Sequence, residues 1–306
     1  MWSRPHLLGI DGLVPDEVTF LLDRAEAYLG RAPKTDTLRG HVVVNLFFES
    51  STRTRTSFEI AGKKLGADVI NVSPSTSSLT KGETLLDTIR NVEAMHADTL
   101  VLRHGASGAA QFLVKHAKSS IVNAGDGTHE HPTQALLDVL TIRRHRKTIK
   151  GLTVAICGDI LHSRVARSNA LLLGLLEARV RLTGPRTMIP MNADALGPTV
   201  TIHQTLDEAV EGADVVMMLR VQNERFTGAM LPTTREYNLT FGLTRAVLLR
   251  AKPDALVMHP GPINRGVEIT SGVADGPQSV ILDQVEAGVA VRMAVLEAVA
   301  RARGTA

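Results

Sequence analysis

Residues 50–55, Ser-Ser-Thr-Arg-Thr-Arg, gather hydroxyl and guanidinium side chains in one short segment. The segment follows an apolar run at 42–48 and precedes the helical spacing of Phe58, Ala61 and Leu65, so it should form the turn from a strand into a helix. Free N–H groups at a helix start bind anions, and arginine forks match phosphate oxygens. An ordinary helix N-cap needs only one hydroxyl. The segment therefore predicts a site for a small phosphorylated ligand, with donors from Ser51, Thr52, Arg53, Thr54 and Arg55.

Two further groups are expected at the same edge of the sheet. Arg103 ends an apolar run at 99–103, and His131 lies in the segment 129–134, which follows the next apolar run and precedes a helical pattern. Because parallel strands end at one edge, both side chains should project there. An arginine and a histidine beside a phosphate could polarise a carbonyl oxygen. His131 by itself is more typical of a loop or cap residue, so the prediction rests on the combination.

The loop at 73–83 holds six serines and threonines before Lys81. So polar a segment can lie over a charged ligand as a mobile lid, and Lys81 would then bring a compact ammonium group to it. A solvated linker that carries a lysine is the plainer interpretation of this loop.

The second half of the chain carries arginines directly after strand-like runs. Residues 158–164 stand where a dinucleotide-binding fold carries Gly-x-Gly-x-x-Gly, but the second and third glycines are absent, which argues against NAD. Arg164 and Arg220 instead suit a dicarboxylate, since each fork can hold one carboxylate; surface salt bridges are the alternative. The prolines and glycines at 259–266 fix an irregular turn that can aim carbonyls at a substrate amide.

Strand-like runs, among them 68–72 and 153–157, alternate with amphipathic segments along the whole chain, and a helical pattern runs from 164 to 177. Short Val/Ile/Leu-rich runs without alternation are typical of parallel strands covered on both faces. We therefore expect an α/β fold of two domains, 1–142 and 143–306, each a parallel sheet flanked by helices, with the active site in the interdomain cleft. The last helix, about 283–306, is expected to pack back on the first domain. The basic stretch at 143–150 marks the boundary and is better explained as a solvated helix end than as a nucleic-acid patch.

Length and composition argue against several classes of protein, including membrane-spanning, nucleic-acid-binding and disulfide-rich proteins. A chain of 306 residues suggests two domains, and 44% hydrophobic with 21% charged residues is typical of a soluble globular protein without a membrane span. An aromatic fraction of 3% and a net charge of +3 argue against a nucleic-acid partner. The single cysteine, Cys157, excludes an internal disulfide framework and a multi-cysteine metal site. We read no signal peptide at the N-terminus and expect a cytoplasmic protein.

These segments together resemble the aspartate/ornithine transcarbamoylase family, and within it the aspartate branch, over nearly the whole chain. The ornithine branch typically carries a His-Cys-Leu-Pro turn and a Ser-Met-Gly loop, which this sequence lacks. The segments that carry the resemblance are 47–55, 81–84, 131–134, 220–222 and 259–262.

The resemblance implies transfer of the carbamoyl group of carbamoyl phosphate to L-aspartate in early pyrimidine synthesis, with no metal or organic cofactor. It implies that Ser51, Thr52, Arg53 and Thr54 hold the phosphate and that Arg103 bridges phosphate and carbonyl. Thr54, Arg103 and His131 would polarise the carbonyl, and Gln134 with the backbone of Gly261 and Pro262 would orient the carbamoyl amide. The aspartate ligands would be Arg164, Arg220, Gln222 and Lys81.

The resemblance also implies a homotrimer with shared sites, in which Lys81 and Ser77 enter from a neighbouring subunit. In the family Glu49 pairs with second-domain arginines, here Arg164 and Arg225. Thr80, and Gly261 where some relatives carry leucine, depart slightly from the pattern. A transcarbamoylase for ornithine or a modified ornithine, and a non-catalytic subunit of a larger assembly, stay open as alternatives. The sequence also leaves open whether regulatory chains or a dihydroorotase join the trimer.

Overall fold

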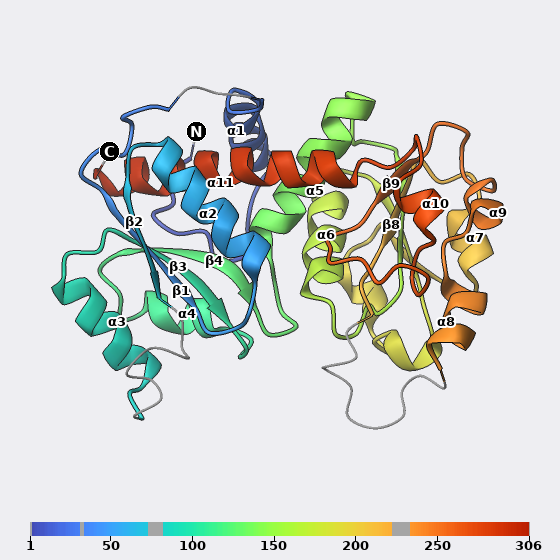
Figure 1. Cartoon of the computed structure of the whole chain (residues 1–306), viewed down its shortest axis with the longest axis horizontal. Coiled ribbons are helices and arrows are strands. Elements are labelled where there is room, and N and C mark those ends of the chain that lie inside the picture. Colours follow the sequence, from blue (N-terminus) through green and yellow to red (C-terminus); the bar gives the residue numbers. More distant parts are fainter. Residues whose placement is uncertain (1, 31–33, 73–81, 222–232, 306) are drawn as a thin grey trace. The chain divides into compact units, whose positions relative to one another are not determined.

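The computed structural model describes residues 2–30, 34–72, 82–221 and 233–305 (Figure 1). The chain folds into two compact units, one formed by 1–137 with 286–306 and the other by 138–285. Each unit contains one parallel sheet with helices packed on it. The expected α/β fold with two parallel sheets is therefore confirmed. No helix in the described ranges combines the length and the apolarity that a membrane crossing requires.

The first unit is built on a four-stranded parallel sheet in the order β2-β1-β3-β4. Its elements are α1 (Pro15–Glu26), β1 (Val42–Phe47), α2 (Thr52–Lys64), β2 (Asp68–Val72), α3 (Leu85–Ala94), β3 (Thr99–His104), α4 (Ala109–Val114), β4 (Ser120–Asp126), the start of α5 (Pro132–Arg146) and most of α11 (Ile281–Arg303). The strand order reverses direction between β1 and β3, which pair with Phe47 opposite Arg103. Ligands of open parallel sheets bind outside the carboxyl ends of the strands at such a reversal.

The central strands of the first sheet are buried on both faces. Val44, Leu46, Leu100 and Leu102 pack in one cluster with apolar side chains of α3 and α4. The intervening residues point to the opposite face of the sheet, and among them Val101 is also fully buried. Covering on both faces explains why these strands are continuous apolar runs in the sequence.

The second unit has a five-stranded parallel sheet in the order β7-β6-β5-β8-β9. Its elements are the rest of α5, β5 (Thr153–Cys157), α6 (Arg164–Leu175), β6 (Arg179–Thr183), the short 3-10 turns η3 (Arg186–Met188) and η4 (Ala193–Leu196), β7 (Val200–His203), α7 (Leu206–Val210), β8 (Val215–Met218), α8 (Thr234–Phe241), α9 (Arg245–Leu248), β9 (Leu256–Met258), α10 (Ser271–Ala274) and the start of α11. The strand order reverses between β5 and β8.

Two edge strands differ from the sequence-based prediction. The run 68–72 was expected to be a buried strand, but β2 is an edge strand whose Ile70 is 51% exposed. Strand β7 was not predicted because it is only four residues long and half of it is exposed, which leaves no apolar run to recognise. Edge strands lack a neighbour on one side, so their sequences are under less pressure to be apolar.

Helix α11 is held in the first unit by a buried carboxylate. Glu297, whose side chain is 3% exposed, lies 2.5 Å from Nε of Arg24 and accepts a 2.8 Å hydrogen bond from the hydroxyl of Tyr28. Arg301 donates to it from the next turn of the helix at 2.9 Å. Burial by itself would raise the pKa of Glu297, but the hydrogen bonds from Arg24 and Tyr28 outweigh burial and hold the pKa below its usual value. These bonds join the α1 segment to the C-terminal helix.

Replacement of this carboxylate should make the stability difference depend on pH. Because the native pKa is lowered, the contribution of Glu297 is fully present above the unfolded-state pKa of about 4.3 and is lost as the pH falls through the native pKa. We expect Glu297→Gln to lower the free energy of unfolding by about 2 kcal/mol at pH 7, and by progressively less in acid. Urea unfolding of both proteins between pH 3 and pH 7 measures this, with Asp36→Asn in the exposed Asp36–Arg39 pair as control. An equal loss at every pH would contradict it.

Candidate active site

The phosphate cradle predicted at 50–55 lies at the reversal point of the first sheet. It connects the end of β1 to the start of α2, where Ser51 is the N-cap residue. The Ser51 hydroxyl makes no cap hydrogen bond to this helix, whereas Thr84 and Ser163 cap α3 and α6 in the usual way. An ordinary N-cap is therefore not the role of this hydroxyl. The first turn of α2 follows the carboxyl end of β1, and N–H groups of a first helical turn have no intrahelical partner, as an anion site requires.

The side chains of the cradle differ in exposure. Thr52 and Arg53 are exposed, Ser51 and Arg55 are intermediate, and Thr54 is buried. Thr54 is only 8% exposed, and its carbonyl accepts a 2.9 Å hydrogen bond from the hydroxyl of Ser57. The first turn of α2 thus combines the guanidinium groups of Arg53 and Arg55 with neutral hydroxyl donors.

Arg103 is fixed at the same edge by partners from two neighbouring strands. Its Nε lies 3.0 Å from the Glu49 carboxylate, which follows β1, and its Nη1 donates to the carbonyl of Ala124 in β4 at 2.9 Å. The side chain is only 11% exposed. Two anchors in different strands hold the guanidinium in one orientation, so it can act as a preorganised donor.

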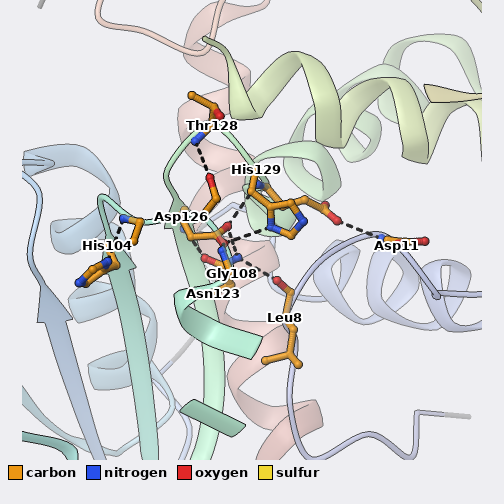
Figure 2. A network of polar contacts seen from close by, with 12 residues as sticks. Leu8, Asp11, His104, Gly108, Asn123, Asp126, Thr128 and His129 are labelled. Carbon is orange, nitrogen blue, oxygen red and sulfur yellow. Dashed lines mark hydrogen bonds and ion pairs between the residues drawn. The ribbon is translucent and has the colours of Figure 1, made fainter. Parts of the chain in front are cut away.

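His131 and Gln134 stand at the start of α5, the next segment along this edge. Both are buried, at 4% and 9% exposure. The turn before them is organised by Asp126, which is fully buried at the end of β4 (Figure 2). Its carboxylate accepts hydrogen bonds from the N–H of Gly108 at 2.6 Å and from the amide of Asn123 at 2.8 Å, and Nδ1 of His129 lies 3.1 Å from it. Asp126 therefore ties the N-cap of α4 and the end of β4 to the residues that precede His131.

Glu130 anchors the same turn on its other side. Its buried carboxylate accepts hydrogen bonds from the N–H groups of Ile10 at 2.7 Å and of Asp11 at 3.2 Å. A Cβ at Gly9 would collide with the Glu130 carboxylate, so a larger residue there would force this carboxylate to shift. Sequence reasoning missed Asp126 and Glu130. The available signal was an acidic residue between Gly125 and Gly127, directly after an apolar strand.

The second sheet brings Arg164 and Arg220 to its own reversal point. Arg164 is the first residue of α6 after β5, and Arg220 follows β8, the strand that pairs with β5. Arg164 is 6% exposed and Arg220 is intermediate. Gly158 allows the close approach at this edge, since a Cβ there would lie 3.1 Å from the hydroxyl of Tyr237 at a φ of +129°. Both arginines thus start from neighbouring strands of one sheet.

The predicted amide-binding turn follows β9 in the same unit. Gly261 has a φ of +63°, a value that favours glycine, and its peptide bond to Pro262 is cis. Gly261 is partly exposed and Pro262 is exposed, while His259 before them is 2% exposed. The predicted site residues Lys81 and Gln222, together with Ser77 and Arg225, lie outside the described residues.

Comparison of this chain with models of known protein families identifies the family to which it belongs. Residues 5–144 match the model described as "Aspartate/ornithine carbamoyltransferase, carbamoyl-P binding domain", and residues 150–299 match the model of the Asp/Orn binding domain. The chain belongs to the aspartate/ornithine carbamoyltransferase family. The expectation drawn from the sequence motifs is therefore confirmed, and the residues of the cradle, Arg103 and His131 fall within the first of the two matched domains.

Relatives with high identity come from the aspartate branch. The chain is 64% identical to the aspartate carbamoyltransferase catalytic subunit of Sorangium cellulosum over 97% of this chain and 93% of that protein. It is 63% identical to the subunit of the same name from Granulibacter bethesdensis, over 98% and 96%.

Solved structures of both branches share the fold. Aspartate transcarbamoylase from Trypanosoma cruzi, in complex with carbamoyl aspartate and phosphate, superposes with a TM-score of 0.89 at 31% identity and covers 97% of this chain and 96% of its own. Ornithine carbamoyltransferase from Thermus thermophilus gives 0.86 at 26% identity, covering 97% and 99%. Because both branches fit the fold, the acceptor has to be argued from the site residues.

Proposed function

We propose that this protein is an aspartate carbamoyltransferase, which transfers the carbamoyl group of carbamoyl phosphate to the amine of L-aspartate and releases phosphate. The observation that carries the proposal is the pair of arginines at the reversal point of the second sheet, Arg164 and Arg220. A dicarboxylate suits two arginine forks, whereas ornithine offers only one carboxylate and its α-ammonium group would be repelled by them. The name of the 64%-identical relative supports the same acceptor.

Carbamoyl phosphate binds to the first unit. Ser51, Thr52, Arg53 and Thr54 hold the phosphate at the start of α2, where backbone N–H groups and a guanidinium complement its charge. Arg103 bridges the phosphate and the carbonyl oxygen. Its two fixed anchors, Glu49 and the carbonyl of Ala124, let it meet that oxygen without reorientation.

The carbonyl of the substrate is polarised by Thr54, Arg103 and His131. Gln134 and the backbone of Gly261 and Pro262 orient the carbamoyl amide. In the family-based assignment Arg164 binds the α-carboxylate of aspartate, and Arg220 with Gln222 binds the side-chain carboxylate. Lys81 joins the site from a neighbouring subunit of a homotrimer.

The reaction then needs positioning and charge stabilisation and no metal or organic cofactor. The deprotonated amine of aspartate attacks the carbonyl carbon, and the oxyanion of the tetrahedral intermediate is stabilised by Arg103, Thr54 and His131. The C–O bond to phosphate breaks, and the departing phosphate takes the proton that the amine nitrogen loses. The product, N-carbamoyl-L-aspartate, belongs to pyrimidine synthesis, which we place in the cytoplasm.

Two rival functions give different results in one assay. The purified chain is supplied with carbamoyl phosphate and either L-aspartate or L-ornithine, and the carbamoylated product is measured. Turnover of aspartate alone supports the proposal. Turnover of ornithine indicates the other branch of the family, and no turnover with either acceptor indicates a non-catalytic subunit.

Removal of Arg220 should weaken the acceptor site selectively. We expect Arg220→Ala to raise the KM for aspartate about 10- to 100-fold, because one charged pair of hydrogen bonds to a carboxylate is lost, and to change the KM for carbamoyl phosphate little. Arg250→Ala is the control, since this arginine of the same unit is 49% exposed and paired with Asp207 at the surface. A change in the KM for carbamoyl phosphate as large as that for aspartate would refute the assignment.

A further inference from the structure

The turn after β9 is held by a buried pair of ionisable side chains, His259 and Glu268. The turn has no regular secondary structure of its own through Pro260–Asn264, so side chains have to fix its shape. His259 is 2% exposed and Glu268 is fully buried. Buried polar groups are costly unless they are paired, which indicates that these two side chains are placed there to hold the turn.

The hydrogen bonds of His259 indicate one tautomer of its imidazole. Its Nδ1 accepts from the N–H of Gly261 at 2.8 Å, so Nδ1 carries no proton. The hydrogen therefore sits on Nε2, which lies 3.1 Å from Oε1 of Glu268 and donates to it. One imidazole in one tautomer thus connects the backbone of Gly261 to the Glu268 carboxylate.

Glu268 binds the far end of the turn as well. The same Oε1 accepts a 2.6 Å hydrogen bond from the N–H of Asn264. The side-chain amide of Asn264 in turn donates to the carbonyl of Val221 at 3.2 Å. Val221 is the neighbour of Arg220, so one carboxylate links the amide-binding turn to the segment that carries an aspartate ligand.

A second set of buried polar side chains fixes the position of His259. The N–H of His259 donates to Oε1 of Gln284 at 3.0 Å, and the amide of Gln284 donates to Asp138 at 2.7 Å. Asn169 donates to the other oxygen of Asp138 at 2.8 Å. Gln284, Asp138 and Asn169 are all at most 3% exposed, so the position of His259 is fixed from the helices on which the turn packs.

We infer that Glu268 and His259 are positioning residues that set the carbonyls of the 260–262 turn against the carbamoyl amide, and so select carbamoyl phosphate over acyl phosphates without that amide. The inference rests on the proposed function, since that function assigns Gly261 and Pro262 to the amide. Neither side chain touches the substrate; both act through the backbone of the turn.

The test compares carbamoyl phosphate with acetyl phosphate, in which a methyl group replaces the amide. Glu268→Leu removes the acceptor for His259 and Asn264 and should lower kcat/KM for carbamoyl phosphate about 100-fold, because loss of orientation is costly to the reaction. The inhibition constants of acetyl phosphate and of inorganic phosphate should change less than about twofold. Glu268→Gln keeps one carbonyl oxygen to accept both bonds and should restore kcat/KM to within a few-fold of the unaltered protein.

Two further variants keep the inference falsifiable. His259→Asn retains an oxygen for the Gly261 N–H but cannot reach Glu268, so it should show the same selective loss in smaller degree, even if Glu268→Leu fails to fold. Arg265→Ala removes only the exposed pair with Asp275 in the same turn and should behave like the unaltered protein.

Equal losses for carbamoyl and acetyl phosphate, unchanged selectivity in His259→Asn, or a Glu268→Gln variant as impaired as Glu268→Leu would each overturn the inference. In those cases the unaltered protein still carbamoylates aspartate. No turnover by the unaltered protein would instead remove the proposed function, and the inference with it.

Discussion

Arg53→Ala is expected to lower kcat/KM for carbamoyl phosphate by about 10³-fold, the largest effect of a single substitution in this chain. Arg53 is exposed in the first turn of α2, where the helix N-terminus and the neighbouring hydroxyls already favour an anion. Its exposed guanidinium supplies positive charge to the cradle and can bind two phosphate oxygens at once. Loss of one such donor in a preorganised site costs about 10²- to 10³-fold, and phosphate binding in the ground state weakens as well.

The loss should be one of binding rather than of folding. Calorimetry with inorganic phosphate should show a dissociation constant raised in parallel with the KM for carbamoyl phosphate, while the melting temperature stays unchanged because the side chain is exposed. Arg39→Ala is the matched control, since this arginine of the same unit is 80% exposed and lies 3.9 Å from Asp36. Phosphate affinity that is equal in Arg53→Ala and in Arg39→Ala would remove Arg53 from the site.

Arg103→Ala should act mainly on kcat. Arg103 is anchored by Glu49 at 3.0 Å and by the carbonyl of Ala124 at 2.9 Å, so its remaining donors are oriented before the substrate arrives. Charge on the carbonyl oxygen grows as the tetrahedral intermediate forms, and a preorganised donor stabilises it more than it stabilises the bound substrate. We expect kcat to fall by about 10²- to 10³-fold, with a smaller rise in the KM for carbamoyl phosphate.

Arg103→Lys tests orientation separately from charge. A lysine keeps the positive charge, but it has no planar fork to bind Glu49 and the Ala124 carbonyl while it faces the substrate. Its kcat should therefore stay well below that of the unaltered protein. Arg90→Ala, a 64% exposed arginine of α3, is the control. If Arg103→Lys recovered full kcat, the anchoring by Glu49 and Ala124 would have no catalytic importance.

Local features of the fold and the site could be predicted from the sequence. The strand at 153–157 has the predicted bounds, and α6 begins at Arg164 as expected, because a buried parallel strand or a helix start is encoded by adjacent residues. The strand at 68–72 also has its predicted bounds, although its expected burial was wrong. The helix start after 50–51 was predicted in the same way, and the assignment of phosphate to this segment stays a prediction that rests on donors consecutive in the chain. The family followed from such segments because each is short, local and rich in functional groups.

The residues that support the site could not be found in this way. Glu130 receives hydrogen bonds from Ile10 and Asp11, which are about 120 positions away. Glu268 is effective only because the backbone of the turn at 259–264 folds back onto it. An isolated acidic residue in a loop has no spacing or periodicity that distinguishes a buried anchor from a solvated surface group.

The chain by itself thus determined which residues could bind phosphate and carboxylates, because those groups come in short runs at strand ends. Only the tertiary structure decided that β1 lies beside β3 and β5 beside β8, which sets Arg103 next to Glu49 and brings Arg164 and Arg220 to one edge. Strand order depends on pairing between distant segments, and the sequence of an apolar strand does not identify the strand with which it pairs. For the same reason the buried carboxylates of Asp126, Glu130 and Glu268 became visible as anchors only in the folded units.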